Sequence, residues 1–539
     1  MKVLLIQPPI EDFYDTSIRL QPIGLSYIKA SLLKEHKGIE VKIIDFHRNY
    51  GRQTIAIPKE LEYLKPYYQY HDKSAFSTFH QYYHFGAKYS EIKKVIEGED
   101  ADVIGISSLF TPYYREVLKT AEAARNVSSA KIVIGGSHVS AFPELMLKHP
   151  AVDFTISGEA EKSFCDLISA IKNNNEKPTI PGVGYKVNCE MVLNGKSDSL
   201  PMNELPIPDM NDYSINDYLY ENKPLSFVIT SRSCPHKCSF CSVHVTFGER
   251  YSRRDPKLVL EELKLRYDQG YRVFDFEDDN LSFYRKEMHE LLDGIDVLFP
   301  KRDVQFLAMN GISYLSLDKD LLIKMKKVGF TNLNLALVSS DKSVLESTKR
   351  PHTVEKYQEI VHIGSELGFD MVTYQIIGLP NESLESMIQT LAFNAQQPVL
   401  LGASLYYQAP TQFSLEHDRL RSEKDLFCSR LTAMYSESDQ CKRNDMYTLF
   451  ITTRILNFFK SLEIVKDTNI DELLENKIFE AVLQNNINIL KELHQKGVLY
   501  ADTPKGLIER EHFNVNLYKT VINKIKKIPT QNEKLILLK

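Results

Sequence analysis

Three cysteines lie close together near the middle of the chain, in the stretch Ser-Arg-Ser-Cys-Pro-His-Lys-Cys-Ser-Phe-Cys. They are Cys234, Cys238 and Cys241, with the spacing C-x3-C-x2-C. Three thiolates on one short loop can bind three irons of a cubane 4Fe–4S cluster, and the fourth iron is then open to a small molecule. Zinc is the main alternative, with His236 or His244 completing a four-ligand structural site. Three unrelated buried cysteines are a further interpretation, but the clustering in one turn argues against it.

A barrel of alternating strands and helices is expected to position this loop. Helical patterns such as 256–267 and 318–327 separate apolar runs that are typical of strands. We expect strands at 227–230, 273–277, 304–308, 332–338, 372–377 and 403–407. Six such units predict a partial (β/α)6 barrel of the TIM type over residues 224–409, open on one side. The cysteine loop follows the first of its strands.

The first third of the chain has the same alternation. Helical patterns lie at 23–36, 114–125 and 159–172. Between them are apolar runs rich in Val and Ile, each closed by a small or polar residue, at 3–7, 41–46, 103–107, 131–134 and 154–157. This pattern predicts a parallel sheet covered on both faces, which is a doubly wound, Rossmann-like α/β domain over residues 1–174. Ligands of such domains bind at the C-terminal ends of the strands.

Three further segments have compositions of their own. Residues 175–223 are rich in Pro, Gly and Asn, which predicts an irregular linker, and residues 410–539 have mainly helical patterns. Residues 60–90 contain many Tyr, Phe and His side chains, too many for a solvated linker. We interpret this aromatic stretch as an insertion that packs on the edge of the sheet, with a lid over a flat cofactor or an apolar substrate as the alternative.

Composition excludes several classes of protein. The 539 residues exceed one typical domain, and 43% hydrophobic with 25% charged residues excludes a disordered or collagen-like chain. The net charge is -5 without a long basic run, so nothing indicates a nucleic-acid partner. The N-terminal apolar run is too short for a signal peptide, and the apolar stretch 446–462 is shorter than the roughly 20 residues of a spanning helix. We therefore expect no membrane span and a cytoplasmic location.

The cysteine motif, with Phe240 directly before Cys241, resembles that of the radical S-adenosylmethionine superfamily. Its position after the first strand of a partial barrel adds to the resemblance. The resemblance implies that the open iron binds the amino and carboxylate groups of S-adenosylmethionine. It also implies that an external electron donor such as flavodoxin or ferredoxin reduces the cluster, which then cleaves S-adenosylmethionine to a 5′-deoxyadenosyl radical. No catalytic residue is implied beyond the cluster.

The same resemblance implies contacts to S-adenosylmethionine from the ends of other barrel strands. Besides Phe240, these contacts come from Asp278 and Asp279 toward the methionine amine, Ser339 toward the ribose, and Gly378 near the adenine. Relatives usually carry a glutamate just before the position of Ser339 and a second glycine at the position of Asn381, and this sequence departs from both. A plain acidic loop is the alternative for the aspartates, and a simple turn is the alternative for Gly378.

The first domain resembles the cobalamin-binding domain found in front of many such enzymes. The resemblance covers most of residues 1–170 and rests on small-residue turns at successive strand ends, because glycine lets the backbone approach a bulky ligand closely. It implies cobalamin contacts from Ser107, Ser108, Leu109, Phe110, Gly135, Gly136, Ser137, His138, Gly158 and Glu159. The first strand runs into Gln7-Pro8-Pro9 instead of the Asp-x-His-x-x-Gly motif, so we expect cobalt to have no histidine ligand.

Together the two resemblances imply a radical enzyme that uses a 4Fe–4S cluster, S-adenosylmethionine and cobalamin. The expected reaction is transfer of a methyl group to an unactivated carbon of a small-molecule, lipid or peptide substrate. Cyclisation or ring rearrangement is the alternative reaction, and a non-catalytic sensor of corrinoid or cluster is the alternative class of protein.

Overall fold

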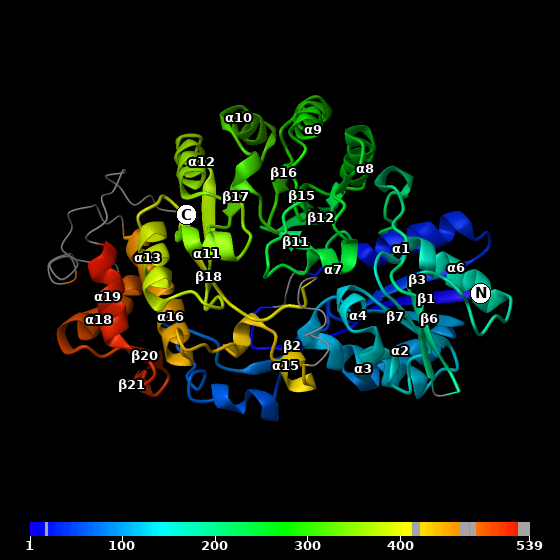
Figure 1. Cartoon of the computed structure of the whole chain (residues 1–539), viewed down its shortest axis with the longest axis horizontal. Coiled ribbons are helices and arrows are strands. Elements are labelled where there is room, and N and C mark those ends of the chain that lie inside the picture. The colour runs from blue at the N-terminus through cyan, green and yellow to red at the C-terminus, as the bar shows by residue number, and fades with distance from the viewer. Residues whose placement is uncertain (17–19, 189, 412–420, 463–473, 475–480, 526–539) are drawn as a thin grey trace. The chain divides into compact units, whose positions relative to one another are not determined.

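The structure is a computed structural model, in which residues 1–16, 20–188, 190–411, 421–462, 474 and 481–525 are described (Figure 1). The chain divides into two compact units. Unit 1 contains residues 1–55, 82–307 and 409–429, and unit 2 contains residues 56–81, 308–408 and 430–539. Each unit is taken by itself below.

A seven-stranded sheet forms the first half of unit 1, with the order β10-β9-β8-β7-β6-β1-β3. The last five strands of this order, from β8 to β3, are parallel, as expected of a doubly wound domain. These five strands are β1 (Lys2–Gln7), β3 (Glu40–Asp45), β6 (Val103–Ser107), β7 (Lys131–Gly135) and β8 (Phe154–Ile156).

Helices cover both faces of this sheet. One face carries α1 and α6, which contact each other, and the other carries α2 and α3 (Figure 1). The alternating apolar residues of β1, such as Val3 and Leu5, are fully buried between these layers, as the sequence pattern predicts. The helices are α1 (Ile23–Glu35), α2 (Tyr89–Glu99), α3 (Tyr114–Arg125), α4 (Ser137–Ala141), α5 (Pro143–Leu147) and α6 (Ala160–Lys172).

The predicted linker is not irregular throughout. It contains β9 (Val183–Val187) and β10 (Glu190–Leu193), and β9 adds to the sheet antiparallel to β8. The prediction of an irregular segment was wrong here, because β9 supplies Val183 and Tyr185 to the core under α6. The sheet is therefore mixed rather than purely parallel.

A second sheet in unit 1 holds the first half of the predicted barrel. Strand β12 (Lys223–Val228) pairs in parallel with β15 (Val273–Phe276), which pairs with β16 (Gln305–Leu307). The neighbouring elements are β11 (Leu219–Tyr220), the paired β13 (Ser231–Arg232) and β14 (Ser252–Arg253), and the helices α7 (Val243–Phe247), α8 (Pro256–Asp268) and α9 (Arg285–Leu298). Helix α15 (Glu423–Phe427) also belongs to unit 1 and contacts residues 111–113.

Unit 2 holds the second half of the predicted barrel as a parallel sheet in the order β17-β18-β19. These strands are β17 (Asn332–Leu335), β18 (Asp370–Ile377) and β19 (Leu400–Leu405). The helices that alternate with them are α10 (Lys319–Val328), α11 (Lys342–Ser347), α12 (Val354–Glu366) and α13 (Leu384–Ala395). All six strands expected of the barrel are thus present in the two units.

The C-terminal part of unit 2 is mainly helical, as predicted. Its described elements are α16 (Arg443–Ser461), α18 (Ala481–Lys496), α19 (Val515–Ile525) and a hairpin of β20 (Tyr500–Thr503) and β21 (Gly506–Glu509). Helix α16 packs against β19 and α19.

The aromatic stretch splits between the units. Residues 56–81 pack on the helical region, where the rings of Phe76 and Phe458 are 5.4 Å apart and Asp72 forms a buried ion pair with Arg510. This contradicts our interpretation of the stretch as an insertion on the edge of the sheet. The remainder forms β5 (Tyr82–Phe85), which pairs with β2 (Ile10–Asp12) and β4 (Arg52–Ile55) in a small antiparallel sheet of unit 1.

Among the described residues, no helix combines the length and apolar character needed to cross a membrane.

Candidate active site

The cysteine loop lies in unit 1 between β13 and α7. Cys238 is buried, and Cys234 and Cys241 are half-buried. The backbone N–H of Cys241 donates to the carbonyl oxygen of Cys238 at 3.1 Å, which closes the turn. The side-chain N–H of Asn280 donates to the Sγ atom of Cys234 at 3.5 Å, a contact that favours a thiolate at this position. Burial raises the pKa of the Cys241 thiol to about 11, so metal binding must displace its proton.

Two aspartates that follow β15 hold the segment leading into the loop. Asp278 is buried and accepts hydrogen bonds from the backbone N–H of Thr230 at 3.2 Å, from the hydroxyl of Thr230 at 2.7 Å, and from the hydroxyl of Ser231. Asp279 is exposed and accepts from the backbone N–H of Ser233 at 3.0 Å. The carboxylate of Asp278 thus accepts hydrogen bonds inside the protein, whereas the exposed side chain of Asp279 is open to a cationic ligand.

Ser233, the residue before the first cysteine, has a strained backbone. Its φ of 69° lies in the left-handed region, which non-glycine residues rarely adopt. The hydrogen bond to Asp279 and a second one, from the Ser233 hydroxyl to the carbonyl oxygen of Gly248 at 2.7 Å, stabilise this conformation.

The histidines near the loop have other roles. His244 is buried, and its Nε2 atom lies 2.7 Å from the carbonyl oxygen of Cys234. The ring of His236 packs against Phe283 at 6.2 Å. Within the described part of the chain, no group of three or more His, Cys, Asp and Glu side chains is arranged to hold a metal ion. A cubane differs from a single ion because each cysteine binds a different iron, and the donor set of three thiols on one loop fits it.

The remaining predicted contacts to S-adenosylmethionine are distributed over both units. Phe240 is half-buried in the loop of unit 1. In unit 2, Ser339 is buried and donates to Glu382 at 2.8 Å, and Glu382 also accepts from Ser386 at 2.9 Å. Burial raises the pKa of Glu382 to about 7. The hydroxyl of Ser339 is therefore engaged inside the protein.

The turn after β18 explains one departure from the family pattern. Gly378 has a φ of 90°, and Asn381, which stands where relatives usually carry glycine, has a φ of 65°. Asparagine tolerates the left-handed region better than other side chains do, so it can replace glycine here without changing the turn.

A cavity of about 250 Å³ lies at the C-terminal ends of the parallel strands of unit 1. Its wall is mainly apolar, with side chains such as Leu5, Ile23 and Phe164. Seven of the ten residues predicted to contact cobalamin line it, namely Ser107, Leu109, Gly135, Gly136, Ser137, Gly158 and Glu159. The fold therefore brings together most of the residues selected from strand-end motifs.

Glycines form a cradle in this cavity. Gly136 has a φ of 121°, and a Cβ atom there would lie 2.5 Å from the carbonyl oxygen of Ser108. Gly158 has a φ of 91°, and a Cβ atom there would lie 2.6 Å from the Oγ atom of Ser197. Any side chain would clash with Ser108 or Ser197 at these two positions, so the tight packing of these turns requires glycine. Gly135 differs, since its Cβ atom would meet nothing closer than 3.7 Å.

The other three predicted residues lie outside the cavity wall. Ser108 and His138 are fully buried, and the Ser108 hydroxyl and the His138 Nε2 atom have no hydrogen-bond partner among the described residues. Burial lowers the pKa of His138 to about 3, so its ring is neutral. Phe110 is 42% exposed, as is Leu109, which gives the sheet edge a pair of apolar side chains open to a flat ligand. The small-residue turns and the apolar wall of the cavity fit an apolar ligand such as the nucleotide end of cobalamin, and the buried atoms of Ser108 and His138 do not take part.

Sequence reasoning selected Glu159 but missed its charged partners in the wall of this cavity. Arg232 forms ion pairs with Glu159 and Glu161, and all three side chains are buried and line the cavity. The sequence offered one signal for these residues, which is that each lies beside a motif already selected. Arg232 comes two residues before the first cysteine, and the glutamates lie in the turn Gly-Glu-Ala-Glu after β8.

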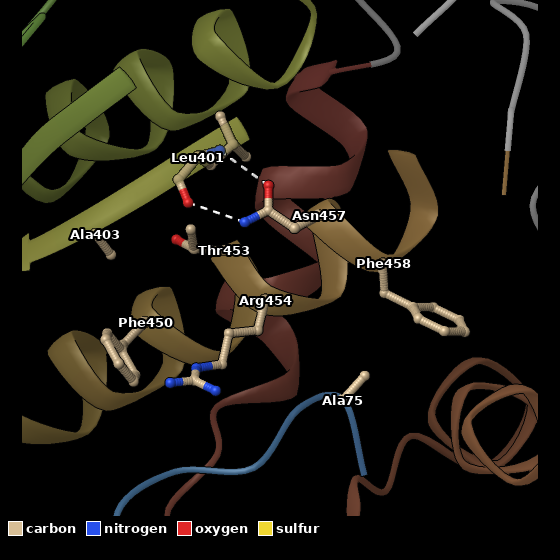
Figure 2. Close-up of a pocket in the computed structure, with 8 residues that line it drawn as sticks. All are labelled: Ala75, Leu401, Ala403, Phe450, Thr453, Arg454, Asn457 and Phe458. Atoms are coloured by element: carbon tan, nitrogen blue, oxygen red, sulfur yellow. Dashed lines mark hydrogen bonds between the residues drawn. The ribbon is translucent and has the colours of Figure 1, made fainter. Parts of the chain in front are cut away.

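A second cavity, of about 430 Å³, lies in unit 2 between β19 and α16 (Figure 2). Asn457 spans the edge of β19, where its side chain accepts from the N–H of Leu401 and donates to the carbonyl oxygen of the same residue, both at 2.9 Å. Arg454 reaches back toward Phe450, with its guanidinium 5.1 Å from the ring centre (Figure 2). No motif in the sequence indicated this cavity.

Comparison with known proteins defines the class to which this fold and site belong. The family model described as "Radical SAM superfamily" matches residues 228–393, and the one described as "B12 binding domain" matches residues 80–168. The chain therefore carries a cobalamin-binding domain followed by a radical S-adenosylmethionine domain. The predicted fold class is thereby confirmed.

The chain is similar to two curated methyltransferases. It is 26% identical to an uncharacterized methyltransferase of Pyrococcus horikoshii, over 73% of this chain and 77% of that protein. It is 25% identical to a cytidylyl-2-hydroxyethylphosphonate methyltransferase of Streptomyces wedmorensis, over 76% and 79%. Its fold is similar to that of TsrM from Kitasatospora setae, a radical S-adenosylmethionine methyltransferase solved with cobalamin and a 4Fe–4S cluster bound. The TM-score is 0.57 and the identity 18%, over 75% of this chain and 74% of that chain.

Proposed function

We propose that this protein is a cobalamin-dependent radical S-adenosylmethionine methyltransferase that methylates an unactivated carbon. The observation that carries the proposal is that unit 1 holds both the three-cysteine loop and a glycine-built cavity at the C-terminal sheet edge. The similarity to two curated methyltransferases supports methyl transfer over the cyclisation or rearrangement considered above.

The proposal gives each group of residues a task. Cys234, Cys238 and Cys241 would hold the cluster, and the exposed carboxylate of Asp279 would bind the amine of S-adenosylmethionine. Once bound, the cluster and S-adenosylmethionine supply an adenosyl radical, and cobalamin carries the methyl group. The exposed apolar side chains of Leu109 and Phe110 would exclude water from a bound corrin, and exclusion of water protects reactive carbon centres from side reactions.

Asp278 and Asn280 have supporting tasks in the same loop. Asp278 fixes the backbone at Thr230 and Ser231, and Asn280 places a donor at the sulfur of Cys234. Hydrogen bonds to cluster sulfurs are one of the means by which proteins set cluster potential. These two residues therefore position and tune the cluster rather than contact the substrate.

The partners follow from this chemistry. Reduction of the cluster requires an external one-electron donor, for which we propose flavodoxin or ferredoxin. A cluster with an open iron requires a reducing compartment, which supports the cytoplasm as the location. The substrate is a small molecule, a lipid or a peptide, and the fold alone does not select among these.

The first experiment measures cofactors in protein prepared without oxygen and supplied with cobalamin. We expect iron, sulfide and one corrin per chain. Addition of S-adenosylmethionine and a reductant should then give 5′-deoxyadenosine. Corrin absent while iron is present would contradict the methyltransferase proposal, and stoichiometric zinc in place of iron would contradict the radical mechanism altogether.

Product mass distinguishes the reactions once a substrate is found. Methyl transfer adds one methyl group, whereas cyclisation removes hydrogen without adding carbon. S-adenosylmethionine labelled in its methyl group should pass the label to the product.

A further inference from the structure

We propose that Gln7 is a specificity-determining residue of the unit 1 cavity, whose carboxamide forms a hydrogen bond with the nucleotide end of bound cobalamin. The inference rests on the proposed function, because it takes the occupant of the cavity to be cobalamin. Nothing in the family resemblance assigns a contact to this side chain.

Gln7 is the last residue of β1 and continues an apolar row of side chains. Side chains alternate along a strand, so Val3, Leu5 and Gln7 share one face of the sheet. Val3 and Leu5 are fully buried there against residues of α1 and α6. The row therefore passes from core side chains to a carboxamide at the strand end, where Gln7 lines the cavity.

The carboxamide of Gln7 is available to an occupant of the cavity. Gln7 is 5% exposed, and both polar atoms of its carboxamide belong to that exposed part. Neither atom forms a hydrogen bond within the described part of the chain. Because polar side chains that are this deeply buried normally have partners, we expect the partner of this carboxamide to enter with the occupant.

A second glutamine in the same wall differs from Gln7. Gln21 also lines the cavity and is 4% exposed. Its Oε1 atom accepts from the N–H of Phe227 at 2.7 Å, and its Nε2 atom donates to the carbonyl oxygen of Leu225 at 3.2 Å. Gln21 thus uses both of its polar groups on β12, whereas Gln7 uses neither on the protein.

The position of Gln7 in the sheet agrees with a binding role. In the order β6-β1-β3, the chain leaves β1 for β3 on one side, while β6 lies on the other side. Doubly wound domains bind ligands at such a switch point, outside the carboxyl ends of the strands. Ile6 pairs with Ile106, so the next residues, Gln7 and Ser107, lie side by side there, and both line the cavity.

The remaining wall limits the chemistry of the occupant. Most lining side chains are aliphatic or aromatic, and the carboxylates of Glu159 and Glu161 are paired with Arg232. The nucleotide end of cobalamin has an apolar aromatic base with a ring nitrogen, a ribose hydroxyl and phosphate oxygens at its edge. A carboxamide both donates and accepts hydrogen bonds, so Gln7 suits this polar edge while the apolar wall suits the base.

The test compares cobalamin with cobinamide, which has the corrin ring but lacks the nucleotide end. Gln7→Leu removes both polar groups and keeps an apolar side chain in the wall. We expect its affinity for cobalamin to fall about tenfold, the effect of about one hydrogen bond. Its affinity for cobinamide should stay within about twofold, because the deleted contact is absent from that complex in either protein.

Absorbance titration of the full chain, prepared without oxygen, measures both affinities. Unchanged affinity of Gln7→Leu for cobalamin would overturn the inference. An equal loss for cobalamin and cobinamide would also overturn it, because the contact would then not involve the nucleotide end. If Gln7→Leu does not fold, Gln7→Met, which has an unbranched side chain of similar length, takes its place with the same expected results.

Gln21→Leu is the matched control for a structural role. It leaves the N–H of Phe227 and the carbonyl oxygen of Leu225 without their partner, so it should lower the melting temperature of the cofactor-free protein. Gln7→Leu should leave that temperature unchanged or raise it, because it removes a carboxamide without a partner among the described residues. A melting temperature that falls in both variants alike would overturn the inference.

The same titrations separate this inference from the proposed function. If the unsubstituted protein binds neither cobalamin nor cobinamide, both the inference and the proposed function fail. If it binds cobalamin and the Gln7 variants bind it equally well, the inference fails alone.

Discussion

Two cavities lined by described residues, one in each unit, are built in different ways. The cavity of unit 1 is formed largely by backbone, at strand ends where Gly136 and Gly158 have positive φ values and admit no side chain. The cavity of unit 2 is formed by side chains from three separate segments, around Ala75, Leu401 and the helix α16 (Figure 2). Backbone-built sites leave glycine motifs in a sequence, whereas side-chain-built sites leave no local signal.

The polar groups of the two cavities differ in the same way. In unit 1 the charges of Arg232, Glu159 and Glu161 pair with one another in the wall of the cavity. In unit 2 the amide of Asn457 uses both its groups on the backbone of Leu401. The charged groups of the first cavity thus neutralise one another in its wall, whereas the polar group of the second cavity closes the edge of β19.

The largest effect should come from the cysteine loop. Cys238→Ala should abolish iron binding and formation of 5′-deoxyadenosine, because three thiolates are needed to hold the cluster. Corrin binding should remain within about twofold, a free-energy change below 0.5 kcal/mol, since Cys238 does not line the cavity. Iron analysis and corrin absorbance measure the two effects. Cys165→Ala, which removes a buried cysteine outside the loop, is the control and should retain iron.

Loss of corrin from Cys238→Ala would mean that the cysteine loop and the cavity are not independent binding sites. The contrast drawn between a cluster loop and a separate backbone-built cavity would then fail.

The next effect should come from filling the unit 1 cavity. Gly135 lines it, and its Cβ atom would meet only ordinary contacts at 3.7 Å, so a side chain fits the backbone but takes up space. Gly135→Val should lower corrin affinity by more than tenfold, a loss of over about 1.4 kcal/mol, with little change in melting temperature. Gly135→Ala should give a smaller loss. Absorbance titration and thermal unfolding measure the pair.

Equal affinity of the valine and alanine variants and the unsubstituted protein would place cobalamin elsewhere. Gly136→Ala is a useful contrast, because its clash with the backbone of Ser108 should lower stability as well as affinity.

A third effect concerns a buried carboxyl group in unit 2 and its dependence on pH. Burial raises the pKa of Glu382 from 4.5 to about 7, so the folded protein retains a proton there that the unfolded chain has lost. The stabilisation that this retained proton gives the folded protein, measured as free energy of unfolding, is complete below about pH 4.5. It falls by up to about 3 kcal/mol as pH rises through 7. Glu382→Gln should flatten this part of the stability profile, measured by denaturant unfolding between pH 5 and 8.

Glu385→Gln is the control for the pH measurement. Glu385 lies three residues further along, is exposed and pairs with Lys524 at the surface, so its removal should leave the slope unchanged. A slope that persists in Glu382→Gln would show that another group titrates in this range.

Much of this molecule could be predicted from sequence because its signals are local. The apolar runs at 3–7 and 103–107 coincide with β1 and β6, and the cysteine spacing and glycine turns identified the two candidate sites. Strands β9 and β10 were missed because the surrounding segment is rich in Pro and Gly, while β9 forms by tertiary pairing with β8 and β10 by pairing with β9. Local composition cannot report such contacts.

The missed site residues depended on long-range pairing. Arg232 and Glu161 are 71 residues apart in sequence, and only the fold shows that they meet. The aspartates after β15 were selected as ligand contacts for their charge, but the sequence could not show that Asp278 is buried against Thr230 and Ser231. Likewise, the aromatic rings at 60–81 could not reveal that their partners lie more than 350 residues later, as in the bond from Tyr68 to Thr432 with a separation of 364.

The smallest effect tests whether the unit 2 cavity is first of all a structural closure. Asn457→Ala removes two hydrogen bonds to Leu401 and leaves a backbone N–H and C=O group of β19 without partners. We expect the free energy of unfolding to fall by about 1–3 kcal/mol, the cost of leaving buried polar groups unsatisfied, without loss of iron or corrin. Asn488→Ala removes an exposed asparagine that accepts from Gln484, and should change stability by only a few tenths of a kcal/mol. If the two variants behave alike, water replaces Asn457 readily, and the edge of β19 is open enough to accept an extended ligand instead.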